Sequence, residues 1–161
     1  MLKSLFKYMT MINTPKVDKQ NITSAYNHSI EVIFRDIDSF GHVNNAVYFT
    51  YLETVRTKYF QELKTRSGID EMDMIVAQAT CDYKSPAYIA EQLNISVGIT
   101  RFGKKSFDCM YIINTDKGRQ IASAKTIQVA YNYITNTTVK VPEKFKQTVI
   151  EYQGGLWLPA M

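Results

Sequence analysis

Cysteines and long apolar runs are scarce in this sequence, and each scarcity excludes a class of protein. Of the 161 residues only two are cysteines, Cys81 and Cys109. They lie far apart and have no second cysteine or histidine at ligand spacing, so neither a zinc site nor a redox pair is predicted. Reduced thiols in the cytoplasm are the expected state. No apolar run approaches the roughly 20 residues that a membrane-spanning helix requires, so no transmembrane segment is predicted.

An excess of charge of one sign is missing from the middle of the chain. The formal net charge is +4, but residues 29–133 carry twelve Lys or Arg and twelve Asp or Glu, which cancel. The basic excess therefore lies in the two ends. A neutral centre with basic ends argues against a nucleic-acid partner.

The chain length suits one folded domain with a core of its own. We expect a flexible leader over residues 1–28, the folded domain over 29–134 and a C-terminal extension over 135–161. A short helix is predicted after Pro142. Trp157, the only tryptophan, lies in the final stretch, where it either docks on a partner subunit or belongs to a disordered tail.

Apolar periodicity predicts one strand followed by one long helix. Residues 30–35 have the composition of a short strand. The helix is indicated by apolar residues at spacings of three and four, namely Tyr48, Leu52, Val55, Tyr59 and Leu63. Further apolar residues lie off this face (Ala46, Val47, Phe49 and Phe60), which predicts a helix wrapped by its surroundings. Gly68 supplies the predicted end of the helix.

The rest of the chain has the alternation typical of strands. Strands are predicted over residues 74–83, 93–102 and 106–113, and a last strand contains residues 127–133. Because the connections are short, we expect these four strands to form an antiparallel meander. The predicted class is α+β, with an antiparallel five-stranded sheet curled around one long central helix.

Two aspartates, Asp36 and Asp38, stand in the loop that leads into this helix. A helix N-terminus presents unpaired N–H groups and a partial positive charge, so it stabilises an anion or a developing oxyanion. A carboxylate beside it acts as a general base or as a nucleophile on a carbonyl bound there. The alternative is plain helix capping by Asp38 or Ser39. Two aspartates, a Gly-His turn and paired asparagines are more than a cap requires.

This loop carries a resemblance to a known family. The pattern D-x-D-x-x-G-H-V-N-N-x-x-Y over residues 36–48, the E-x-x-R that follows and Y-K-S-P-A at 83–87 resemble the hotdog-fold thioesterases of the 4-hydroxybenzoyl-CoA thioesterase type, including the bacterial acyl-CoA thioesterases. The resemblance covers about residues 29–134. It implies a hotdog fold and hydrolysis of an acyl-CoA or acyl carrier protein thioester without metal or redox cofactor. It also implies a homodimer or a tetramer of dimers, with sheets joined edge to edge and each active site between protomers.

Site residues carry over from the family onto matching positions. The second aspartate, Asp38, is implied as the catalytic carboxylate, which either activates water or attacks the carbonyl to form an anhydride. The backbone N–H of Asn45 is implied as the group that polarises the thioester carbonyl. Asn45 replaces the aromatic residue of the hydroxybenzoyl enzyme, and the GHVNN form is closer to the fatty-acyl-CoA branch. Lys104 and Lys105 are implied as contacts of the CoA phosphates, the alternative being solvated charge.

Three neighbours of Asp38 have two interpretations each. His42 is either a general base or a side chain that holds the loop. Asn44 either braces the loop or orients the attacking water. Tyr48 either lines the acyl pocket or belongs to the core.

Three other charged residues are predicted to be structural. Asp36 either raises the pKa of Asp38 or pairs with Arg35 or Arg56, and the pairing is favoured. Glu53 and Arg56, three residues apart, are predicted to form a pair within the helix.

Two rival functions remain. A hotdog acyl-CoA hydratase or dehydratase would use an Asp-His pair, but the family pattern places that histidine five residues after the aspartate, whereas His42 is four after Asp38. A non-catalytic acyl-CoA or nucleotide binder would keep the fold without needing a carboxylate that faces a carbonyl. An assay of CoA release on a panel of acyl-CoAs by the wild type and Asp38→Asn separates the three functions, because a binder turns over nothing and a hydratase consumes enoyl-CoA without freeing thiol.

Overall fold

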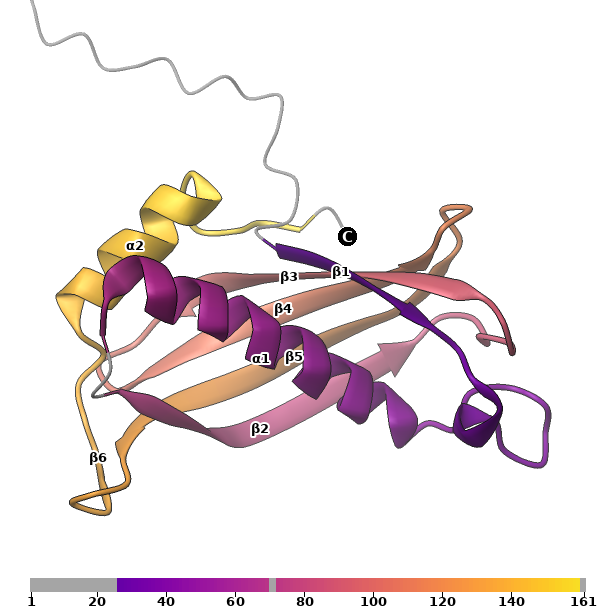
Figure 1. The fold of residues 1–161 in the computed structure, drawn as a ribbon, viewed down its shortest axis with the longest axis horizontal. Helices are drawn as coiled ribbons and strands as arrows, with labels where there is room; N and C mark the ends of the chain where they lie inside the picture. Colours follow the sequence, from indigo (N-terminus) through magenta and orange to yellow (C-terminus); the bar gives the residue numbers. More distant parts are fainter. Residues whose placement is uncertain (1–25, 70–71, 160–161) are drawn as a thin grey trace, which may run out of the picture.

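An antiparallel sheet with a long helix across one face forms the centre of the computed structural model, which describes residues 26–69 and 72–159 (Figure 1). The helix, α1, spans Val47–Ser67, and a second helix, α2, spans Glu143–Gln153. The strands are β1 (Tyr26–Glu31), β2 (Asp73–Tyr83), β3 (Gln92–Phe102), β4 (Ser106–Thr115), β5 (Gln120–Asn132) and the short β6 (Thr137–Thr138). The predicted α+β class with one central helix is confirmed. The predicted leader lies outside the described residues as far as residue 25.

The strand order is β1-β3-β4-β5-β2, with β6 added to the end of β5. Only β3, β4 and β5 form the predicted meander, because β2 pairs with β5 and not with β3. Ile75, for example, lies opposite Val129. The four-strand meander was therefore wrong. Residues 84–91 carry the chain from β2, at one edge of the sheet, to β3, beside the opposite edge. β2 and β3 are therefore not neighbours in the sheet, although the connection between them is short.

The first strand lies earlier than predicted. β1 ends at Glu31, and residues 34–36 form one turn of 3-10 helix in which the Ile33 N–H donates to Asp36 Oδ2 at 3.1 Å. Of the apolar run that suggested a strand, Val32 is buried but Phe34 is 82% exposed. The strand predicted over 30–35 therefore coincides with β1 only at residues 30 and 31, because the residues that follow form the turn that leads to the candidate site.

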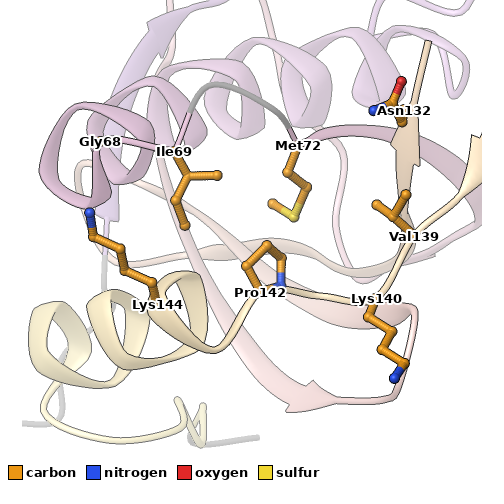
Figure 2. Close-up of a pocket in the computed structure, with 8 residues that line it drawn as sticks. All are labelled: Gly68, Ile69, Met72, Asn132, Val139, Lys140, Pro142 and Lys144. Atoms are coloured by element: carbon orange, nitrogen blue, oxygen red, sulfur yellow. The ribbon is translucent and has the colours of Figure 1, made fainter. Parts of the chain in front are cut away.

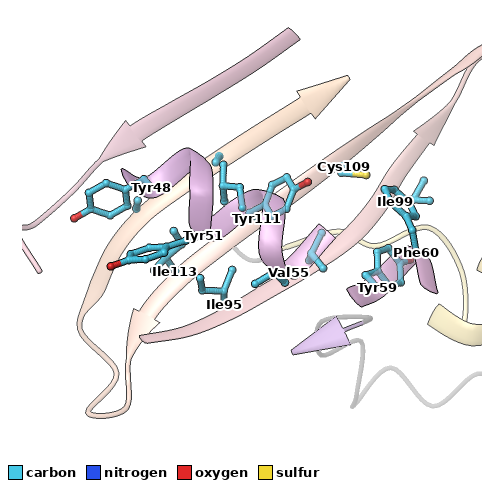
Figure 3. Packing of buried hydrophobic residues seen from close by; sticks show 14 of the residues in the cluster. Tyr48, Tyr51, Val55, Tyr59, Phe60, Ile95, Ile99, Cys109, Tyr111 and Ile113 are labelled. Carbon is cyan, nitrogen blue, oxygen red and sulfur yellow. The ribbon is translucent and has the colours of Figure 1, made fainter. Parts of the chain in front are cut away.

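The inner face of α1 packs on the sheet. Its buried residues include Tyr48, Tyr51, Val55, Tyr59 and Phe60, which contact Ile95 and Ile99 of β3 and Cys109, Tyr111 and Ile113 of β4 (Figure 3). The helix ends as predicted at Gly68, whose φ of +61° favours glycine. The outer side is not wrapped by the described chain, since Phe49 is 37% exposed.

The C-terminal segment belongs to the folded structure. The helix predicted after Pro142 is present as α2, and its Phe145 and Val149 join the core. Trp157 is buried, with its ring over Gly98, and its backbone N–H donates to the Ile99 carbonyl at 3.0 Å. Both expectations for Trp157, docking on a partner and disorder, were therefore wrong. Neither α1 nor α2, the α-helices of the described chain, has the length and apolar composition needed to cross a membrane.

Candidate functional site

The loop that leads into α1 closes on itself. Ile37 and Val43 form an isolated antiparallel bridge, and the Asp38 N–H donates to the His42 carbonyl at 3.0 Å. The Gly41 N–H returns to the Asp38 carbonyl at 3.0 Å, with a φ of +82° at Gly41 that favours glycine. This tight loop fixes the backbone of Asp38 before the helix begins.

The carboxylate of Asp38 has one oxygen engaged and one open. Oδ1 accepts the Phe40 N–H at 2.8 Å, whereas Oδ2 accepts no hydrogen bond from the described residues and lies 3.9 Å from His42 Nδ1. The side chain is one-fifth exposed. Asp38 does not cap α1, whose N-cap is Ala46, so the capping interpretation was wrong. Oδ2 is the oxygen that can take a proton or attack a carbonyl.

His42 lies beside this carboxylate. Its ring stacks on the exposed ring of Phe40, with centroids 6.2 Å apart. Nδ1 is 3.4 Å from the Val43 carbonyl, a weak contact, and 3.9 Å from Asp38 Oδ2. Both interpretations of His42 therefore stay open, because the ring touches the loop and also faces the open oxygen.

Asn44 braces the start of α1. Its N–H donates to the Asp36 carbonyl at 2.9 Å, its side-chain Oδ1 accepts the Ala46 N–H at 2.9 Å, and its carbonyl accepts the Val47 N–H at 3.0 Å. The neighbouring Asn45 N–H has no acceptor among the described residues. It is therefore an unpaired donor at the positive end of a helix of 21 residues.

Three tyrosine rings pack together where the start of α1 meets the end of β2. The ring of Tyr48 lies edge-on to those of Tyr51 and Tyr83, at centroid distances of 6.1 and 5.1 Å. Burial raises the pKa of Tyr48 to about 12. Burial, and then the hydrogen bond to Asp36, also raise the pKa of Tyr51. At neutral pH both hydroxyls are thus protonated, and that of Tyr51 donates to Asp36 Oδ2 at 2.6 Å.

Asp36 is a structural residue, as favoured, but with a different partner from those predicted. Its Oδ2 accepts the Tyr51 hydroxyl at 2.6 Å. No ion pair joins it to Arg35 or Arg56 in the described chain, and none joins Glu53 to Arg56. The predicted pair within the helix is therefore absent.

Asp38 and Asn45 line one hollow of about 560 Å³. The hollow combines a carboxylate, an imidazole, a backbone donor and one cation with aromatic walls, so it suits a polar reacting group attached to an apolar one. Its lining residues are Asp38, Phe40, His42, Val43, Asn45, Tyr48, Tyr83, Lys84, Ser85 and Pro86.

The far wall of this hollow is held by Arg119. Its guanidinium donates to Ser85 Oγ at 3.0 Å, to the Pro86 carbonyl at 2.5 Å and to both carboxylate oxygens of Glu91 at 2.6 and 2.8 Å. The carbonyl of Ala87, the residue after Pro86, accepts the Val43 N–H at 2.9 Å. The segment after β2 and the loop of Asp38 are thereby tied together.

Two other hollows lie elsewhere. One, at the C-terminal end of α1, is lined by Gly68, Ile69, Met72, Asn132, Val139, Lys140, Pro142 and Lys144 (Figure 2). Its described lining residues offer no carboxylate, histidine or hydroxyl. The other lies between α1 and β2 and includes Glu53, Arg56 and Gln128. Neither contains Asp38 or the start of α1. No group of three or more His, Cys, Asp or Glu in the described part of the chain could hold a metal ion.

The structure brings together most of the predicted site but not all of it. Tyr48 is both core and pocket wall, being 3% exposed and part of the lining. Lys104 and Lys105, in the turn between β3 and β4, lie at the end of the sheet opposite Asp38 (Figure 1). Lys105 Nζ there binds the Thr138 carbonyl and hydroxyl at 3.0 and 2.8 Å. One protomer alone therefore does not bring these lysines to the hollow.

Sequence reasoning missed Tyr83, Lys84 and Arg119. The stretch Y-K-S-P-A contributed to the family resemblance, but no role was assigned to its members. Arg119 follows a hairpin turn 34 residues after Ser85, to which it bonds. A contact of this kind leaves no local pattern in a single sequence.

Comparisons with known proteins agree on the fold. A sequence profile described as the thioesterase-like superfamily matches residues 32–149. An uncharacterized protein of Bacillus subtilis (strain 168), YsmA, is 27% identical over 144 residues, which cover 89% of this chain and 97% of that protein.

Two solved structures are similar to this chain in fold. A thioesterase from Thermus thermophilus, complexed with coenzyme A and zinc, has a TM-score of 0.72 and 25% identity, over 81% of this chain and 96% of that one. The hypothetical protein SAV2348 from Staphylococcus aureus, in complex with CoA, has a TM-score of 0.72 and 16% identity, over 84% and 87% of the two chains. The second likeness is one of fold alone.

Proposed function

The chain belongs to the thioesterase-like superfamily, and from this premise we propose that it is an acyl-CoA thioesterase with Asp38 as its catalytic carboxylate. The observation that carries the proposal is a pair of open groups in one hollow. Asp38 and Asn45 both line it, and neither Asp38 Oδ2 nor the Asn45 N–H has a hydrogen-bond partner in the described chain. One supplies a base or nucleophile, and the other supplies a donor for an oxyanion.

The proposed reaction begins when the thioester carbonyl oxygen accepts the Asn45 N–H. Asp38 Oδ2 then takes a proton from water as the water oxygen bonds to the carbonyl carbon, or it bonds to that carbon directly. The negative charge that develops on the carbonyl oxygen is stabilised by the N–H and by the positive end of α1. The C–S bond then breaks, the thiolate of CoA takes up a proton, and the acid is released, in the direct route after water has cleaved the anhydride.

His42 and Asn44 have supporting roles in this proposal. His42, 3.9 Å from Asp38 Oδ2, is close enough to exchange a proton through one intervening water. Asn44 orients the donor, because its own N–H and side chain fix the backbone on both sides of the Asn44–Asn45 peptide. Tyr48 forms the wall against which the acyl group packs.

We also propose that two copies pair through β2. This edge strand exposes apolar side chains, with Ile75 36% and Val76 45% exposed, and an edge of that kind invites another strand. Antiparallel pairing about a two-fold axis would set the Asp73 end of one β2 beside the Tyr83 end of the other. Each hollow would then face the partner's opposite sheet end. That end carries Lys104 and Lys105, which would reach the phosphates of CoA from the partner.

The test is thiol release from short-chain, long-chain and aromatic acyl-CoAs by the wild type and Asp38→Asn. We expect turnover that falls by about two orders of magnitude or more in the variant, the scale for loss of a positioned base. Asp116→Asn, in the exposed turn between β4 and β5, is the matched control and should keep wild-type turnover.

Three outcomes would contradict the proposal. No thiol release from any substrate indicates a binder. Equal rates for the wild type and Asp38→Asn remove Asp38 from the mechanism. Consumption of an enoyl-CoA without thiol release indicates a hydratase.

A further inference from the structure

The Asn45 N–H is flanked by two fixed points. Upstream, the Asn44 N–H is bonded to the Asp36 carbonyl at 2.9 Å. Downstream, the Asn45 carbonyl accepts the hydroxyl of Tyr83 at 2.9 Å. Tyr83 is the last residue of β2, and it reaches Asn45 from 38 residues away in sequence. The backbone on both sides of the open donor is thus held from outside α1.

The position of the Tyr83 hydroxyl is restrained by the packing of the Tyr83 ring. The ring lies edge-on to that of Tyr48, whose side chain is almost fully buried, with centroids 5.1 Å apart. Tyr48 in turn contacts Tyr51, and the Tyr51 hydroxyl donates to the carboxylate of Asp36 at 2.6 Å. Both fixed points, the carbonyl of Asp36 and the hydroxyl of Tyr83, therefore belong to one connected row of aromatic rings and hydrogen bonds.

We infer that Tyr83 is a positioning residue that sets the direction of the Asn45 N–H, an inference that rests on the proposed function. A hydrogen bond weakens as its angle falls away from linear. A donor that is already aimed at the site of the oxyanion needs no rearrangement when the charge develops. Tyr83 does not touch the reacting atoms in this role. It acts by holding the Asn45 carbonyl, so that rotation of the neighbouring peptide is restricted.

The alternative is that Tyr83 only joins β2 to the start of α1. A purely structural bond would lower stability on removal and would affect ground-state and transition-state binding alike. A positioning role predicts weaker binding of the transition state alone, because the oxygen that accepts the Asn45 N–H becomes negatively charged only there.

Tyr83→Phe removes the hydroxyl and keeps the ring that packs on Tyr48. We expect kcat for acyl-CoA hydrolysis to fall about tenfold while KM stays within about twofold, since complete loss of an oxyanion donor costs about 10²–10³ and a misaligned one costs less. Binding of a trifluoromethyl ketone analogue of acyl-CoA, whose hydrate mimics the tetrahedral intermediate, should weaken by a similar factor. Binding of a thioether analogue without the carbonyl should not change.

Tyr133→Phe is the matched control, because Tyr133 is 56% exposed and its hydroxyl has no hydrogen bond within the described chain. Its kinetics should equal those of the wild type. An unchanged kcat in Tyr83→Phe overturns the inference, and so does equal weakening of both analogues with a lowered unfolding midpoint. If the wild type itself releases no thiol, the proposed function fails and this inference falls with it. If the wild type is active and Tyr83→Phe has the same kcat, the role of Tyr83 is refuted but the proposed function stands.

Discussion

Gln153 closes part of the edge of β3 with its side chain, and its replacement by leucine tests the contribution of this closure to stability. Among the described residues, β1 pairs with β3 up to Val97. Beyond that point Gln153 Oε1 accepts the Ile99 N–H at 2.8 Å, and Nε2 donates to the Ile99 carbonyl at 2.9 Å. Oε1 also accepts the Tyr59 hydroxyl at 2.5 Å, and Nε2 also donates to the Gly155 carbonyl at 3.0 Å. One amide thus serves four groups.

Gln153→Leu replaces the amide with an apolar side chain of comparable size, so two buried donors, the Ile99 N–H and the Tyr59 hydroxyl, lose their acceptor. An unsatisfied buried donor costs about 1–3 kcal/mol, so the pair should lower the free energy of unfolding by about 2–6 kcal/mol. Guanidinium unfolding at one fixed protein concentration measures it, because assembly would make stability depend on concentration. Gln147→Leu, exposed on the same helix, should stay within about 0.5 kcal/mol of the wild type.

A double-mutant cycle with Tyr59→Phe separates hydrogen bonding from packing. In the wild type this change removes a bonded hydroxyl and should destabilise. In Gln153→Leu it removes a hydroxyl that has lost its acceptor, so it should cost less or restore stability. The reasoning is refuted if Gln153→Leu behaves like Gln147→Leu, or if Tyr59→Phe has the same cost in both backgrounds.

Two further predictions concern the sheet. Gly98→Ala places a Cβ 2.8 Å from Trp157 Cβ and Cε3, so the tryptophan must move; its fluorescence should shift to longer wavelength, and an unchanged emission maximum would contradict the contact. Burial opposes ionisation of Asp108, but Arg101 and Lys125 outweigh it and hold its pKa below the usual value. Because the folded-state pKa is depressed, this stabilisation is present above the unfolded-state pKa of about 4 and is lost as pH falls through the folded value. Asp108→Asn should therefore be less stable than the wild type at pH 7, by a margin that shrinks in acid unfolding curves; a constant margin would refute it.

Local signals in the sequence predicted α1 and the strands β2, β3 and β4 to within two residues at each end of a strand, but they placed the first strand too late. The apolar residues of α1 recur at helical spacing, and Gly68 ends the helix in the left-handed conformation that favours glycine. The alternation over 93–102 matches β3, in which every second residue from Leu93 to Ile99 is buried, namely Leu93, Ile95, Val97 and Ile99. These features depend on neighbours within one or two turns of chain, and a single sequence contains them.

Contacts between distant segments were not predictable in the same way. The partner of β2, the burial of Trp157 over Gly98 and the tie from Arg119 to Ser85 each join residues that no local spacing relates. For the site, the family motif located Asp38 and Asn45, which do line one hollow. It gave no reason to single out Tyr83, because a tyrosine at the end of a strand is ordinary until the fold places it against Asn45.

The pairing of β2 with β5 also sets an order of events during synthesis. β2 leaves the ribosome directly after α1, but its partner in the chain is completed only when residues 120–132 have been made. Ile75, for example, waits for Val129, 54 positions later. Contacts of such long sequence separation form slowly, because the closure of a large loop precedes the gain from pairing. During that interval the sheet can grow along the order β1, β3, β4 and β5, so it is completed from one edge to the other and β2 is the last strand to be added.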